Sequence, residues 1–130
     1  MMRADTRTIT INNKSQKEVF EYLLQVEKWP EWSVFAPSVT KDGNLWIVHT
    51  PQGDIKLRPA FNAELALLDH YLLVGDNEIF IPNRVVPNGS GAEVIITIFQ
   101  APNLTEDKYQ EQIGWVEKEL QNLKKSLEGC

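Results

Sequence analysis

Large apolar residues recur at steps of four and three near the end of the chain. Together they form one stripe, made up of Tyr109, Ile113, Val116, Leu120, Leu123 and Leu127. This spacing predicts an amphipathic helix over residues 105–128, about 36 Å long at a rise of 1.5 Å per residue. Thr105 can cap its first turn. A stripe of this length needs a large apolar surface opposite it, and the segments upstream are the only candidate for that surface.

A strand and one or two short helices are predicted at the start of the chain. Residues 6–12 alternate between polar and apolar side chains, the pattern of a half-buried strand. Ser15 and Glu18 form a capping-box pattern ahead of an apolar run, which predicts the start of a helix. Pro30 disfavours helix at the residue before it, so this helix ends before the Trp29-Pro30-Glu31-Trp32 segment. That segment is predicted as a turn or as a second, very short helix.

The middle of the chain has the alternation and turn signals of an antiparallel meander. The predicted strands cover residues 38–41, 45–50, 55–58, 67–74, 78–86 and 92–100. The predicted fold class is therefore α+β: one curved antiparallel sheet of about seven strands against the long C-terminal helix, with two short helices between the first two strands. At 130 residues, the chain is expected to form a single domain over residues 1–130.

The hairpin registers determine which polar residues face the helix. Side chains alternate across a strand, so both registers of the 67–86 hairpin put His70 and Asn83 on the more apolar face. That face also carries Leu68, Leu72, Val74, Ile79, Ile81 and Val85, joined by Val94, Ile96 and Ile98 if the loop before the last strand has two or four residues. A three-residue loop would reverse the last assignment. Asp69 and Arg84 are predicted to pair on the outer face, and His49 to point to solvent.

The candidate chemistry is limited to one histidine. His70 titrates near neutral pH and is the candidate catalytic group, a general acid or base; the alternative is that His70 and Asn83 form a satisfied core pair. No phosphate-binding loop, metalloprotease motif or nucleophile elbow occurs in the sequence, and no second titratable inward residue is evident. Two histidines on opposite faces and a terminal Cys130 do not make a transition-metal site. We therefore predict no metal and no cofactor.

Composition narrows the possible partners and compartment. Thirteen basic and eighteen acidic residues give a net charge of −5, which argues against nucleic-acid or anionic-membrane binding as the main role. The chain has no apolar stretch long enough to span a bilayer and no secretory pattern at its start. Cys130 is the only cysteine, so no internal disulfide can form. We expect a cytoplasmic protein that is a monomer or a homodimer.

The order of elements resembles the START/SRPBCC superfamily, in the branch described as polyketide cyclase/dehydrase-like. The motifs that carry the resemblance are Val26-Glu27-Lys28-Trp29-Pro30-Glu31-Trp32, Leu68-Asp69-His70-Tyr71, Pro82-Asn83-Arg84-Val85 and Trp115-Val116-Glu117-Lys118-Glu119-Leu120. The resemblance covers nearly the whole chain. It implies the helix-grip fold, in which a curved antiparallel sheet wraps around the C-terminal helix and leaves a hydrophobic cavity between them.

Three functions remain open on this basis. The leading hypothesis is binding of a hydrophobic or aromatic small molecule, lipid- or polyketide-like, in that cavity. The predicted ligand-binding residues are Trp32, Phe35, Trp46, His70, Ile81, Asn83, Val94, Ile96, Ile113 and Val116. One alternative is a cyclase or dehydratase-type enzyme that uses His70 as general acid or base. The other is a protein-binding module in which an exposed Trp29 or Trp115 marks the partner surface.

Overall fold

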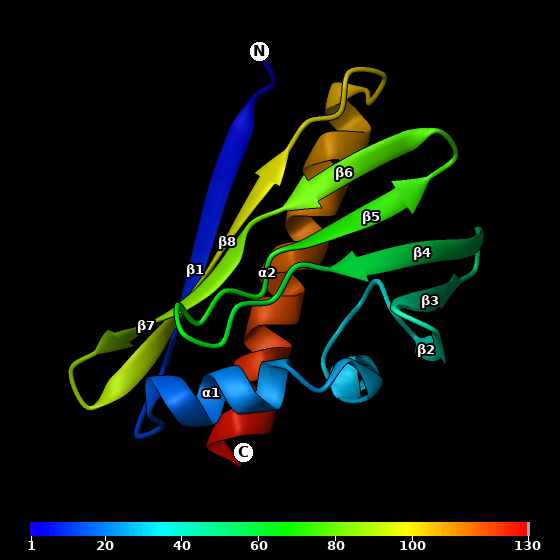
Figure 1. Ribbon diagram of the computed structural model, residues 1–130. Coiled ribbons are helices and arrows are strands. Elements are labelled where there is room, and N and C mark those ends of the chain that lie inside the picture. Colours follow the sequence, from blue (N-terminus) through cyan, green and yellow to red (C-terminus); the bar gives the residue numbers. More distant parts are fainter. Residues whose placement is uncertain (130) are drawn as a thin grey trace.

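The computed structural model describes residues 1–129 and has the predicted α+β architecture, with a long C-terminal helix behind antiparallel strands (Figure 1). Its elements are, in chain order, β1 (Ala4–Ile11), α1 (Gln16–Leu23), the 3₁₀ helix η1 (Val26–Glu31), β2 (Ser38–Asp42), β3 (Leu45–Thr50), β4 (Gly53–Pro59), β5 (His70–Val74), β6 (Asn77–Ile81), β7 (Asn83–Asn88), β8 (Gly91–Phe99) and α2 (Glu106–Glu128). Cys130 lies outside the described residues, so the predictions about its thiol stay predictions.

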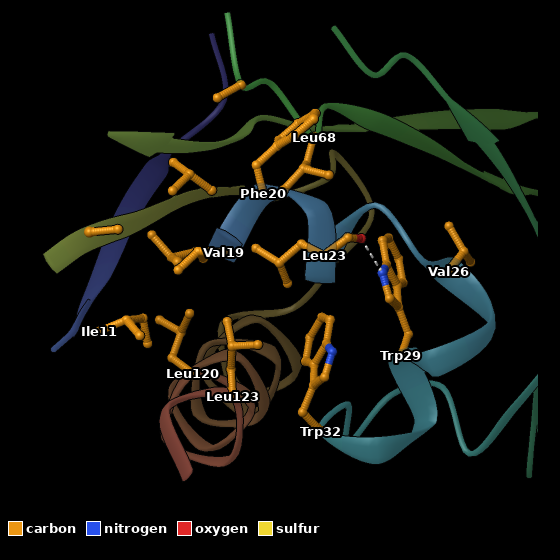
Figure 2. Packing of buried hydrophobic residues seen from close by; sticks show 14 of the residues in the cluster. Ile11, Val19, Phe20, Leu23, Val26, Trp29, Trp32, Leu68, Leu120 and Leu123 are labelled. Carbon is orange, nitrogen blue, oxygen red and sulfur yellow. Dashed lines mark hydrogen bonds between the residues drawn. The ribbon is translucent and has the colours of Figure 1, made fainter. Parts of the chain in front are cut away.

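The two short helices begin as the sequence predicts. The Ser15 hydroxyl accepts a hydrogen bond from the Glu18 backbone N–H, and the Glu18 carboxylate accepts one from the Ser15 backbone N–H, each at 3.1 Å. This capping box satisfies two backbone donors that the helix itself leaves unpaired. The Trp29 indole Nε1 donates to the Leu23 carbonyl at 2.8 Å, which ties η1 to the end of α1 (Figure 2).

Helix α2 follows the predicted range closely. Thr105 is its N-cap, and the Thr105 hydroxyl accepts from the Lys108 backbone N–H at 3.3 Å. Gly129 ends the helix in the left-handed region, with φ of 75°, where a residue without a Cβ is least strained. Four members of the apolar stripe are buried, namely Tyr109, Ile113, Leu120 and Leu123, and the other two, Val116 and Leu127, are half-buried.

The eight strands within residues 1–129 form two antiparallel sheets, ordered β1-β8-β7 and β2-β3-β4-β5-β6. The prediction of one strand over residues 78–86 is therefore wrong, because Pro82 interrupts the strand and separates β6 from β7. Proline has no N–H to donate to a strand ladder. The sheets remain joined at this point, since the Thr97 N–H donates to the Pro82 carbonyl at 3.1 Å and the Leu68 N–H donates to the Asn83 carbonyl at 2.7 Å. From this junction the sheets run to opposite sides of α2 (Figure 1).

The hairpin registers give the predicted faces. Val74 pairs with Asn77 across the β5–β6 turn, and Asn88 pairs with Gly91 across a two-residue β7–β8 turn. His70 consequently points inward. His49 is on the outer face, where it is half-exposed and its Nδ1 lies 2.9 Å from the Asp54 carboxylate.

The predicted ion pair between Asp69 and Arg84 is wrong. The Asp69 carboxylate instead accepts a hydrogen bond from the Asn83 backbone N–H at 2.8 Å. Asp69 is half-buried. The bond lies where Pro82 interrupts the ladder, so the side chain supplies an acceptor for a backbone donor at the break.

We expect Asp69→Ala to lower the free energy of unfolding by about 1–2 kcal/mol, because it leaves the Asn83 N–H without its acceptor. Asp69→Asn is the matched control: the amide oxygen can still accept, so the change should stay within about 0.5 kcal/mol. Urea unfolding of both variants measures the difference. Equal stability of the alanine and asparagine variants would contradict a structural role for this bond.

The main hydrophobic core lies among α1, η1, α2 and the inner faces of the sheets. Figure 2 shows Phe20 of α1 directed toward Leu68 and Leu23 of α1 directed toward Leu120 and Leu123 of α2, with the Trp32 ring near Leu123. A smaller cluster of Ile98, Tyr109 and Ile113 lies near the start of α2. No helix within residues 1–129 is long and apolar enough to cross a membrane.

Candidate ligand cavity

A cavity of about 70 Å³ lies between the sheets and α2. Its wall is built from α1, η1, the loop over residues 33–36, five strands and the middle of α2. This volume can hold a few water molecules. It is much smaller than the roughly 300–1,000 Å³ of most small-molecule pockets.

Seven of the ten predicted ligand-binding residues line this cavity: Trp32, Phe35, His70, Asn83, Val94, Ile96 and Val116. The other three lie elsewhere. Trp46 is half-buried at the edge of the core, with the Lys41 ammonium 5.8 Å from its ring centroid. Ile113 belongs to the smaller cluster, and Ile81 pairs with His70 at the end of β6 without reaching the cavity wall. Residues on one face of a sheet or helix can lie at different positions along its length, so a shared face does not place them at the same cavity.

His70, the first residue of β5, is 7% exposed. Its Nδ1 lies 2.9 Å from the Leu68 carbonyl oxygen. A carbonyl can only accept, so Nδ1 carries the hydrogen and Nε2 presents a lone pair. Burial lowers the pKa of His70, and the Leu68 hydrogen bond and the Asp69 charge only partly oppose this. The imidazole is therefore neutral at pH 7.

The expectation that His70 and Asn83 form a satisfied pair is wrong. His70 donates to the Leu68 carbonyl, and the Asn83 side-chain Oδ1 is buried with no hydrogen-bond partner in the described chain. The indole Nε1 of Trp32, which is 9% exposed, is likewise without a partner within residues 1–129. Unpaired buried polar atoms are rare in folded proteins. Two of them on residues that line one cavity indicate that a water or a ligand group pairs with them there.

The sequence reasoning missed a second titratable group in the cavity wall, Glu119 of α2. Its Oε1 accepts three hydrogen bonds from the loop after η1: 3.2 Å from the Ser33 hydroxyl, 3.2 Å from the Val34 N–H and 3.0 Å from the Phe35 N–H. Burial raises the pKa of Glu119, against the effect of these bonds. Asn122, one turn further on, donates to the Trp32 carbonyl at 3.1 Å. Helix α2 thus holds the loop closed over the cavity.

A signal for Glu119 is present in the sequence. Val116, Glu119 and Leu123 are spaced by three and four residues, so Glu119 lies on the apolar stripe. The charged run Glu117-Lys118-Glu119 is instead typical of a solvated helix face, and this obscured the inward position. Its partners are one hydroxyl and two backbone N–H groups that lie 84 to 86 positions away in the chain. No local pattern predicts such a contact.

The structure also bears on the hypothesis of a protein-binding surface and on metal binding. Trp29 is only 7% exposed, with its ring edge-on to His70 at 5.3 Å between centroids, so Trp29 does not mark a partner surface. Trp115 is half-buried. Across residues 1–129, no group of three histidine, cysteine, aspartate or glutamate side chains could hold a metal ion.

The long helix gripped by antiparallel strands, with a cavity between them, is the arrangement of the helix-grip fold. No known protein family and no curated protein matches the sequence. Solved structures do share the fold. The protein XoxI from Bacillus cereus has a TM-score of 0.80 at 18% identity, covering 97% of this chain and 96% of that one. A START superfamily protein from Mycobacterium smegmatis has a TM-score of 0.77 at 13% identity, covering 97% of each chain.

The fold also extends to a protein named as an enzyme. The Zhui aromatase/cyclase from Streptomyces sp. R1128 has a TM-score of 0.69 at 16% identity, covering 98% of this chain and 94% of that one. These likenesses confirm the START-like, polyketide cyclase-like fold that the sequence predicted. At such identities they establish the fold alone.

The lowered pKa of His70 predicts a pH dependence of stability. The unfolded chain binds the proton of His70 more tightly than the folded chain does. The contribution of His70 to the free energy of unfolding is therefore complete above the ordinary histidine pKa of about 6.5, and it is lost as the pH falls toward the pKa of the folded chain. His70→Leu should remove this loss, seen in urea unfolding of variant and wild type between pH 7.5 and 5. An NMR titration giving His70 an ordinary or raised pKa would contradict the buried neutral imidazole.

Proposed function

We propose that the protein binds a hydrophobic or aromatic small molecule, lipid- or polyketide-like, in the cavity between the sheets and α2. The observation that carries this proposal is the pair of unpartnered polar atoms, Trp32 Nε1 and Asn83 Oδ1, on residues that line a mostly apolar cavity. Apolar walls with a few convergent polar groups are the usual make-up of a small-molecule site. The START superfamily and aromatase/cyclase names among the structures that share the fold are consistent with it.

The size of the cavity adds a condition to this proposal. A ligand of one aromatic ring or more exceeds about 70 Å³, so the wall has to move when it binds. Among the described segments of the wall, only residues 32–36 lie outside the helices and strands. The bonds from this loop to Glu119 are the ones that opening has to break. Binding is therefore coupled to displacement of the loop that carries Phe35.

Native mass spectrometry of protein purified without denaturation tests the proposal. Ala36 is buried in the cavity wall, so Ala36→Leu should fill the cavity. The matched control is Ala63→Leu at an exposed position. We expect a bound small molecule on the wild type and on the control, and none on Ala36→Leu. Absence of any bound species, together with no response to added toluene, would overturn the proposal.

A second candidate function is a dehydration or cyclisation of a β-hydroxy carbonyl compound. The observation that favours it is that His70 and Glu119 share one cavity wall, with pKa values that burial shifts toward each other. His70 Nε2 would take the proton next to the carbonyl, and the protonated form of Glu119 would give its proton to the leaving hydroxyl, which departs as water.

The dehydration is followed by the absorbance of the conjugated product from an aromatic β-hydroxy ketone. Loss of either proton-transfer group should lower kcat by about 100-fold or more, so His70→Gln and Glu119→Gln should both be impaired. Unchanged rates in both variants would exclude this function.

As part of the binding proposal, the protein acts in the cytoplasm as a monomer or homodimer. Cell fractionation tests the compartment, and light scattering tests the oligomeric state.

A further inference from the structure

Within residues 1–129, the cavity wall contains an acidic side chain but no lysine or arginine. The acidic side chain is Glu119 of α2. Three hydrogen bonds fall on one oxygen of Glu119, its Oε1, and two of their donors are backbone N–H groups. Backbone N–H groups are neutral, so they favour the ionised form of Glu119 without cancelling its negative charge.

Hydrogen-bond acceptors also predominate among the unpaired atoms. His70 Nε2 presents a lone pair because Nδ1–H is committed to the Leu68 carbonyl. Asn83 Oδ1 is an unpaired acceptor, and the second oxygen of Glu119 makes no hydrogen bond within residues 1–129. The unpaired donor on the wall is Trp32 Nε1. His70 and Trp32 are both more than nine-tenths buried, at 7% and 9% exposed.

We infer that the cavity selects neutral aromatic ligands that donate hydrogen bonds, of the phenol class, and rejects carboxylates and other anions. This inference rests on the proposed binding function and specifies the chemistry of its ligand. A phenolic hydroxyl donates to one of the acceptors and can accept from the Trp32 indole, while its ring packs against the aromatic and aliphatic wall. A carboxylate would enter without a cationic partner and beside a second negative charge, which is strongly unfavourable in a buried site.

Three probes of similar ring size test this chemistry on the wild-type protein: phenol, benzoate and toluene, each at pH 8. Binding is read from the indole N–H signal of Trp32 in ¹⁵N NMR spectra, because Trp32 lines the cavity and its N–H has no partner within residues 1–129. The indole signal of Trp46, which does not line the cavity, is the internal reference. We expect phenol and toluene to shift the Trp32 signal, with benzoate at least about tenfold weaker than phenol.

Two variants with the same change in charge assign the selectivity to Glu119. Glu119→Gln removes the charge inside the cavity and keeps an oxygen acceptor for the loop. Glu111→Gln removes a charge on the exposed part of the same helix. The phenol-to-benzoate preference should fall by about tenfold in Glu119→Gln and stay unchanged in Glu111→Gln.

The outcomes separate this inference from the proposed function. If benzoate binds the wild type as tightly as phenol, the inference is wrong and the binding function stands. If a folded Glu119→Gln variant keeps the full preference, the assignment to Glu119 is wrong. If none of the three probes moves the Trp32 signal, the binding function fails and the inference fails with it. The wild-type comparison needs no variant, so it remains decisive even if Glu119→Gln unfolds.

Discussion

Leu120→Ala should lower the free energy of unfolding by about 2–5 kcal/mol, the range for a leucine removed from a packed core. Leu120 is 7% exposed at the centre of the gripped helix and contributes to both the main core and the cavity wall. The volume it vacates joins an existing cavity, so the surrounding side chains cannot close it completely. Urea unfolding of the variant measures the loss.

The half-buried Leu127, near the end of the same stripe, provides the control. Leu127→Ala removes the same atoms from a position that water partly reaches, so it should cost clearly less. The enlarged cavity of Leu120→Ala should also accept an apolar ring more readily, and added toluene should restore part of the lost stability through binding to the folded state. A loss of less than about 0.5 kcal/mol in Leu120→Ala would mean that the stripe is not the core described here.

Glu119→Ala should lower the free energy of unfolding by about 2–4 kcal/mol, because three donors of the 33–35 loop lose their acceptor, and two of these bonds are partly buried. Part of this loss is offset, since the variant no longer has to hold a carboxylate in a poorly hydrated site. Glu119→Gln keeps an acceptor for the loop and should remain closer to the wild type. Equal stability of the two variants in urea would show that the loop does not depend on these bonds.

The pH dependence of Glu119 has the opposite sign from that of His70. The folded chain binds the Glu119 proton more tightly than the unfolded chain, because burial raises its pKa above the ordinary value of about 4.5. Its contribution to stability is complete below that value and is lost as the pH rises through the folded pKa. Relative to wild type, Glu119→Gln should therefore gain stability as the pH rises from 4 to 8.

The sequence predicted the parts of the fold that depend on local periodicity. The three- and four-residue steps determine the face of α2, and Ser15 with Glu18 determines the start of α1. The inward position of His70 follows from the two-residue period of a strand, which gives the same face in either hairpin register. These features need only neighbours in the chain, so the amino-acid order is sufficient to predict them.

The features that the sequence reasoning missed depend on contacts between distant segments. Pro82 did carry a local warning, since proline is disfavoured inside a paired strand, yet the alternation around it favoured one continuous strand. The role of Asp69 arises only once that break exposes the Asn83 N–H. The burial of Glu119 depends on the loop after η1, whose backbone donors reach it from the other end of the chain. The position of Glu119 in the cavity wall thus depends on contacts between segments that are far apart in the sequence.

A crystal structure of the protein grown with phenol tests the central claim, that the cavity between the sheets and α2 is a binding site for small aromatic molecules. We predict phenol in the cavity, with its hydroxyl within hydrogen-bond distance of Trp32 Nε1, His70 Nε2 or Glu119, and with residues 33–36 displaced from their present position. Phenol bound only at the outer surface, with the cavity unchanged at about 70 Å³, would contradict the claim.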